Sequence, residues 1–111
     1  MSDYNPEKWL IVKITGPDTP PVHKVFACWY GGYLGSDSWK LNSGITAVTE
    51  KGDYFFFDGS SGSTYACCKG VYGASSYGYG VLENLVTKAL ANNIIIEVLP
   101  EETNWTEINY E

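Results

Sequence analysis

The side chains of this sequence best suited to nucleophilic or metal chemistry are three cysteines and one histidine, namely Cys28, Cys67, Cys68 and His23. A histidine beside a cysteine would generate a thiolate nucleophile, and such pairs meet in space rather than in sequence. None of the three cysteines, however, lies in a nucleophile-elbow or protease-like context. We therefore predict no catalytic residues and a partly exposed His23, and leave open whether His23 contacts a cysteine.

The spacing of the cysteines also argues against a metal site. Cys67 and Cys68 are adjacent in a segment predicted to be a strand, so their side chains should point to opposite faces. Zinc ligands must converge, and their usual spacing is C-x₂₋₄-C. We therefore expect no metal and no cofactor. One of these two cysteines should be buried and the other partly exposed, with all three cysteines as free thiols.

Two other patterns could suggest chemistry but carry little weight. The segment 59–64, Gly-Ser-Ser-Gly-Ser-Thr, resembles a phosphate-binding loop but lacks the lysine and the following helix that such loops use. A hairpin turn is the better interpretation. Asp37, Asp53 and Asp58 flank loops without a defined pairing, so general acid–base catalysis has no support.

The most distinctive feature is a pair of segments rich in glycine and aromatic residues, at residues 29–35 and 72–80. Tyrosine, serine and glycine are common in recognition surfaces, where tyrosine provides a large contact area at low entropic cost. Alternatively, the glycines only form turns and the tyrosine rings pack over a sheet edge. The partner-binding surface predicted from these segments and from nearby acidic groups consists of Tyr33, Asp37, Tyr77, Tyr79, Glu101 and Glu102.

The charged residues of the sequence indicate which kinds of partner the protein can bind. The 111 residues carry a formal net charge of −6, and all seven basic residues are lysines. The lack of arginine and of a basic patch weighs against direct nucleic-acid binding and against binding to an anionic membrane. Five glutamates and no lysine follow from residue 97 onwards. This acidic stretch is either a solubilising tail or a patch that engages a basic partner surface.

Hydrophobic patterning predicts the elements that must position these residues. Strands are expected at 9–14 and 22–30 around a Pro-rich loop, at 45–49 and 54–57 around a tight turn, and at 64–69 and 94–98. Residues 39–41 fit a short strand or a turn. A helix is predicted at 81–91, with residues 70–80 as a loop. The fold class is therefore α+β, with an antiparallel sheet of five to six strands and one helix packed on it.

Residues 1–111 should form a single domain, with residues 1–8 and 101–111 at its periphery. The run Tyr54-Phe55-Phe56-Phe57 lacks polar alternation, which is typical of a central strand covered on both faces. We expect the helix to cover one of these faces through Leu82, Leu85 and Val86. The apolar run 9–14 is too short for a signal-peptide core or a membrane span, so we expect a cytoplasmic protein.

A set of short motifs lies between residues 24 and 72. It consists of Val25, Phe26, Trp29, 31–34, 37–39, 41–45, Gly59, 61–63 and Tyr65. In these residues the stretch resembles small uncharacterised proteins of tailed bacteriophages, over less than half of the chain. The resemblance implies an accessory phage protein that acts in the bacterial host cytoplasm by binding and blocking a host protein, such as a component of a bacterial immune system. It brings no active site.

The leading functional hypothesis is therefore a non-enzymatic protein that binds a host protein with a basic surface and inhibits or modulates it. The alternative is a small enzyme or small-molecule-binding domain with a pocket between the two Gly/Tyr-rich loops. A structural or self-assembling module, and hence a homo-oligomer, is the third hypothesis.

Overall fold

An antiparallel hairpin of strands β1 (Lys8–Thr15) and β2 (Val22–Trp29) lies at the centre of the computed structural model, which describes residues 3–31 and 35–110. The pairing runs from Lys8↔Cys28 to Ile14↔Val22. The β-branched and aromatic residues of both segments favour extended backbone. Three prolines in the loop at residues 16–21 prevent either strand from continuing. The predicted hairpin is therefore confirmed.

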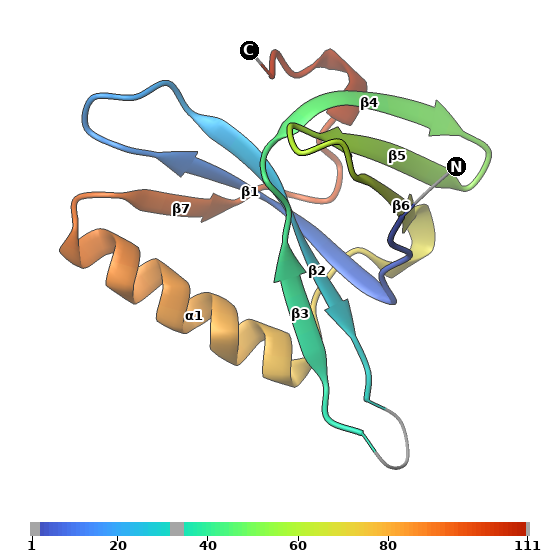
Figure 1. Cartoon of the computed structure of the whole chain (residues 1–111), viewed down its shortest axis with the longest axis horizontal. Coiled ribbons are helices and arrows are strands. Elements are labelled where there is room, and N and C mark those ends of the chain that lie inside the picture. The colour runs from blue at the N-terminus through green and yellow to red at the C-terminus, as the bar shows by residue number, and fades with distance from the viewer. Residues whose placement is uncertain (1–2, 32–34, 111) are drawn as a thin grey trace.

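In the part of the chain that the structure describes, seven strands form two antiparallel sheets, and the predicted α+β class is confirmed. The four-stranded sheet adds β3 (Ser38–Leu41) and β7 (Ile95–Val98), in the order β3-β2-β1-β7. The three-stranded sheet has the order β4-β5-β6, from β4 (Ile45–Lys51), β5 (Tyr54–Gly59) and β6 (Thr64–Cys68). Figure 1 shows the two sheets on either side of the β3–β4 crossover. The single sheet that we expected is thus divided in two.

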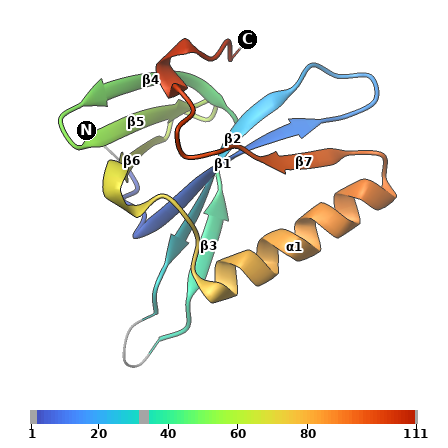
Figure 2. The same ribbon diagram turned by 180° about the vertical axis from the view of Figure 1, so that it is seen from behind.

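The helix α1 (Ser76–Ala91) packs on the four-stranded sheet, as Figure 2 shows from behind. Leu82 lies in one apolar cluster with residues of β1 and β2, which are Leu10, Val12, Phe26 and Cys28. Our prediction that the helix covers the Phe-rich strand is therefore wrong. The connection explains the error, because residues 92–94 lead directly into β7, and β7 pairs with β1.

The helix begins five residues earlier than predicted. Ser75 caps it, and its hydroxyl oxygen accepts a hydrogen bond from the backbone N–H of Gly78 at 3.0 Å. Gly78 is buried, and a Cβ at this position would lie only 2.5 Å from Sγ of Cys28. Glycine normally disfavours helix, but here it lets the first helical turn approach β2. The tertiary contact therefore overrides the local preference.

An aromatic core fills the space between the two sheets. Trp9 on β1 lies 5.6 Å from the ring of Phe57 on β5 and 6.0 Å from the ring of Trp105, as centroid distances. All three side chains are at most 2% exposed. Trp105 opens a short 3-10 helix, η2 (Trp105–Glu107). The C-terminal segment expected at the periphery therefore contributes a central residue to the core.

The Phe-rich strand β5 is central in its own sheet but covered on one face only. Phe57 is fully buried, and Phe55 packs against the same inter-sheet core. On the opposite face Tyr54 is exposed and Phe56 is half-buried. Phe56 lines an open hollow on the outer surface of the sheet. The prediction of a strand covered on both faces is therefore wrong for β5, because no helix of the described residues lies on its outer face.

The three cysteines are free thiols that differ in burial. Cys67 is buried between the sheets and Cys68 is half-exposed on the opposite face of β6, as predicted. Burial raises the pKa of the Cys67 thiol well above its usual value. Cys28 is buried beneath α1, and burial also raises the pKa of its thiol. Neither Cys28 nor Cys67 is therefore poised as a thiolate at neutral pH.

Truncation of β5 side chains should distinguish the buried face of this strand from the open one. Phe57→Ala should lower the free energy of unfolding by about 3–5 kcal/mol, because it leaves a cavity between the sheets. Phe56→Ala should lower it by clearly less, since this ring is half-buried. Urea denaturation of both variants measures the difference. Equal losses would contradict the assignment of the two faces.

The cysteines should react with a thiol reagent in two steps. In the native protein Cys68 should react first, because Cys28 and Cys67 are buried with raised thiol pKa values. All three should react in denaturant. Mass spectrometry after a short pulse of iodoacetamide identifies the modified residue. Fast labelling of Cys67 in the folded protein would show that the core between the sheets opens readily.

Candidate functional site

An apolar groove of about 380 Å³ lies between helix α1 and strand β7. We call it the α1–β7 groove. The helix contributes side chains that lie one turn apart on one face, and Val98 of β7 lies across from them. The lining residues are Tyr79, Leu82, Glu83, Val86, Thr87 and Val98.

The strand side of the groove follows from alternation along β7. Ile96 and Val98 share the face of the strand that turns toward the helix. Ile96 packs against the apolar cluster beneath α1, whereas Val98 remains 41% exposed. Tyr79 is 51% exposed on the first turns of the helix. The apolar surface of the groove is therefore only partly covered by the protein itself.

Strand β7 also leaves one edge unpaired. It is the last strand in the order β3-β2-β1-β7, and within the described residues it pairs with β1 alone. The N–H and C=O groups on its other edge are thus available for a further strand. Two exposed apolar residues, Leu90 and Ile95, flank the turn that joins α1 to this strand.

Three of the predicted partner-binding residues act through their charges on the half-buried Tyr72. The Tyr72 hydroxyl donates to the carbonyl oxygen of Leu99 at 2.5 Å and accepts from the N–H of Ile11 at 3.2 Å. Burial raises the pKa of Tyr72 to about 12, and Glu101, Tyr79 and Glu102 add to this rise through their charges. Both glutamates are exposed. Glu101 lines a separate hollow together with Tyr72 and Lys69, three residues after Val98 of the groove.

The other predicted residues lie nearer to the start of α1. Tyr77 is exposed on the first helical turn, so it belongs to the helix and not to the predicted loop. Asp37 is half-buried, and its carboxylate accepts a hydrogen bond from the N–H of Gly31 at 3.0 Å. Asp37 also contributes to the raised pKa of Cys28, which lies next to the helix cap Ser75. Tyr33 lies outside the described residues.

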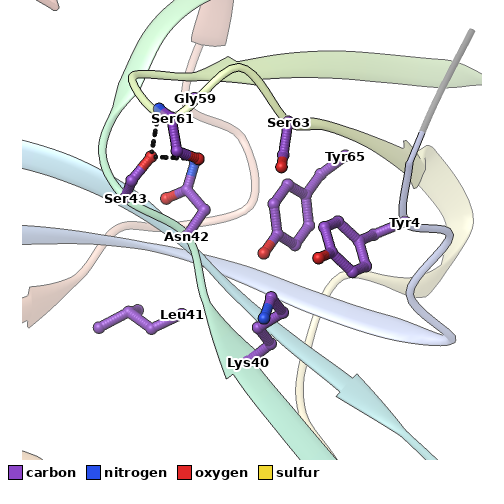
Figure 3. Close-up of a pocket in the computed structure, with 9 residues that line it drawn as sticks. All are labelled: Tyr4, Lys40, Leu41, Asn42, Ser43, Gly59, Ser61, Ser63 and Tyr65. Atoms are coloured by element: carbon purple, nitrogen blue, oxygen red, sulfur yellow. Dashed lines mark hydrogen bonds between the residues drawn. The ribbon is translucent and has the colours of Figure 1, made fainter.

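A second concave site, which sequence reasoning missed, is a polar cavity of about 250 Å³. It lies between the β3–β4 connection and the β5–β6 turn, and Figure 3 shows its lining. Ser43 accepts a hydrogen bond from the N–H of Ser61 at 2.9 Å, and its hydroxyl lies 3.1 Å from that of Ser61. The rings of Tyr4 and Tyr65 stack at 4.8 Å on the other side of the cavity.

Asn42 lines this polar cavity with a buried side-chain amide that is only partly hydrogen-bonded. It is 4% exposed, and its Oδ1 accepts a hydrogen bond from the backbone N–H of Val25 at 2.8 Å. This bond fixes the orientation of the amide. The Nδ2 group is buried and has no hydrogen-bond partner. The polar residues at 42–44 and 60–63 were the available sequence signal. For the second run we preferred a hairpin turn to a phosphate-binding loop, and the structure does place a turn between β5 and β6 there.

His23 is remote from the nearest cysteine along its own strand. Five residues of extended chain separate it from Cys28, which corresponds to about 17 Å. Its ring instead packs edge-on against Tyr110 at 5.4 Å. Burial, followed by the charge of Lys13, lowers the pKa of His23. Among the described residues, no three His, Cys, Asp or Glu side chains gather into a group that could hold a metal ion.

Comparisons with known proteins found none that is similar to this chain. Protein-family models, curated proteins and solved structures were all searched, and none of them matched the chain. In the part of the chain that the structure describes, no helix has the length and apolar character needed to cross a membrane.

Proposed function

We propose that this protein is a non-enzymatic binding protein that captures an extended, basic segment of a partner protein in the α1–β7 groove. The observation that carries the proposal is the position of a free strand edge beside a half-covered apolar groove. An extended segment that adds to a sheet edge gains affinity from main-chain hydrogen bonds, and alternate side chains provide specificity. The groove between α1 and β7 would receive those alternate side chains.

The chemistry of the groove favours a partner with mixed apolar and basic residues. Its floor is formed by Leu82, Val86 and Val98, which suits apolar side chains of the partner. Glu83 lines the groove, and the exposed Glu101 and Glu102 follow Val98 in the chain by three and four residues. Carboxylates at a rim speed the encounter with a basic partner and disfavour acidic ones. The net charge of −6 likewise favours the approach of a basic partner.

The resemblance to phage accessory proteins extends this proposal. In that setting the partner is a host protein in the bacterial cytoplasm, and occupation of its basic segment inhibits or modulates it. A component of a bacterial immune system is one such target. The proposal needs no catalytic group in the protein, since binding alone would block the target.

Selection from a peptide library tests the groove. Peptides chosen from a random seven-residue library on the immobilised protein should alternate apolar residues with lysine or arginine. They should bind Tyr79→Ala at least several-fold more weakly, because this ring lines the groove and carries a large contact area. The matched control is Tyr54→Ala, which removes a comparably exposed tyrosine from β5. Peptides that bind both variants equally well would place the site elsewhere.

Charge reversal tests the acidic stretch. Replacement of Glu101 and Glu102 by lysine should chiefly slow association of the selected basic peptides, and more strongly at low salt, since exposed charges act at long range. Stopped-flow fluorescence measures the rate at several salt concentrations. The control with the same change in net charge is the pair Asp18→Lys and Asp53→Lys, in two other turns. An equal effect of both pairs would show that only net charge matters.

A further inference from the structure

We infer that the polar cavity between the β3–β4 connection and the β5–β6 turn binds a small anionic ligand through its carboxylate or phosphate oxygens. This site shares no lining residue with the α1–β7 groove, so the inference stands independently of the proposed function. Its support is a buried donor without a partner, a single positive charge and several hydroxyl groups around one cavity.

The buried donor is Nδ2 of Asn42. A buried N–H group without an acceptor is costly, and such groups in folded proteins call for a specific explanation. Figure 3 shows this nitrogen pointing toward Ser61, beside the hydrogen bonds between Ser43 and Ser61. A Cβ on Gly59 would lie 3.3 Å from the same nitrogen. A ligand oxygen that replaces the contact between the two serine hydroxyls would supply the missing acceptor.

The cavity is electrostatically unlike the rest of the chain. The protein has 13 acidic residues, yet none of the nine residues that line this cavity is acidic. Lys40 supplies a positive charge, and its ammonium group lies 5.2 Å from the centre of the Tyr4 ring. The neighbouring carboxylates of Asp3 and Asp58 are both held by hydrogen bonds from Thr64. The charged side chain that lines the cavity is therefore a cation, which favours an anionic ligand.

The remaining polar groups can donate to such a ligand. Ser61 and Ser63 bring hydroxyls from the β5–β6 turn. The phenol of Tyr65 also lines the cavity, and burial raises its pKa to about 12, so it stays protonated and can donate. A ligand that accepts hydrogen bonds from an amide, a phenol, two hydroxyls and an ammonium group must be rich in oxygen acceptors.

Titration with two simple anions tests the inference on the full-length, ¹⁵N-labelled protein. Inorganic phosphate and succinate are added separately, and the side-chain amide of Asn42 and the backbone amides of Ser61 and Ser63 are followed by NMR. We expect saturable shifts of these signals with at least one anion. A response to phosphate alone assigns a phosphate ligand, and a response to succinate alone assigns a carboxylate. Sodium chloride at matched ionic strength should leave the signals unchanged.

Two variants and a control make the result specific. Lys40→Gln should weaken binding about tenfold, because it removes a charge-assisted hydrogen bond. Asn42→Asp keeps the acceptor for Val25 but replaces the donor by a negative charge, and it should abolish binding. Lys88→Gln makes the same charge change on α1 and should bind as the wild type does. The inference fails if neither anion shifts Asn42 beyond chloride, or if Lys40→Gln and Lys88→Gln weaken binding equally.

Discussion

The packing of Trp9 is the interaction on which the rest of the structure depends. Its ring is 1% exposed and contacts aromatic rings from the second sheet, from the segment before the helix and from the C-terminal segment. Its indole N–H donates to the carbonyl oxygen of Cys68 at 2.6 Å, and its own carbonyl accepts from the N–H of Gly73 at 2.8 Å. One residue of β1 therefore joins four parts of the chain that are distant in sequence.

This junction also determines where the α1–β7 groove lies. The segment held by Trp9 leads into α1, and Tyr72 within it bonds to Leu99 just after β7. The two ends of the helix–strand unit are thus tied to the same part of β1. The helix must cross the four-stranded sheet toward β7, and it reaches the edge of that sheet without covering it. A free edge and a half-filled groove result from this path.

The two concave sites have opposite chemistry and lie in different parts of the fold. The groove is apolar with carboxylates nearby, whereas the polar cavity contains serines, an amide and a lysine. Residues 41–43, Gly59 and Tyr65 lie around the polar cavity. Strands from both sheets meet there, so the cavity exists only because the β3–β4 crossover brings Asn42 beside the β5–β6 turn.

The local sequence pattern was sufficient to predict much of the fold. Three features follow from the conformational limits of single residues. They are the Pro-rich loop between β1 and β2, the turn at Gly52, and the turn after the helix, where Asn93 has a φ of 61°. The opposite faces of Cys67 and Cys68 follow from the alternation of a strand. These features depend on neighbours in sequence, and the sequence alone therefore determined them.

The tertiary structure decided which surfaces meet. An apolar run without polar alternation indicates a strand that is covered on both faces. In this protein the strand covered on both faces is β1, whose residues 9–12 lie between the helix and the second sheet. The run in β5 is covered on one face only. The glycines at 78 and 80 predicted a loop, and the helix forms there because Gly78 fits against Cys28. The buried amide of Asn42 likewise depends on a crossover between sheets. Each outcome rests on contacts between distant residues, and such contacts leave no periodic signal in the sequence.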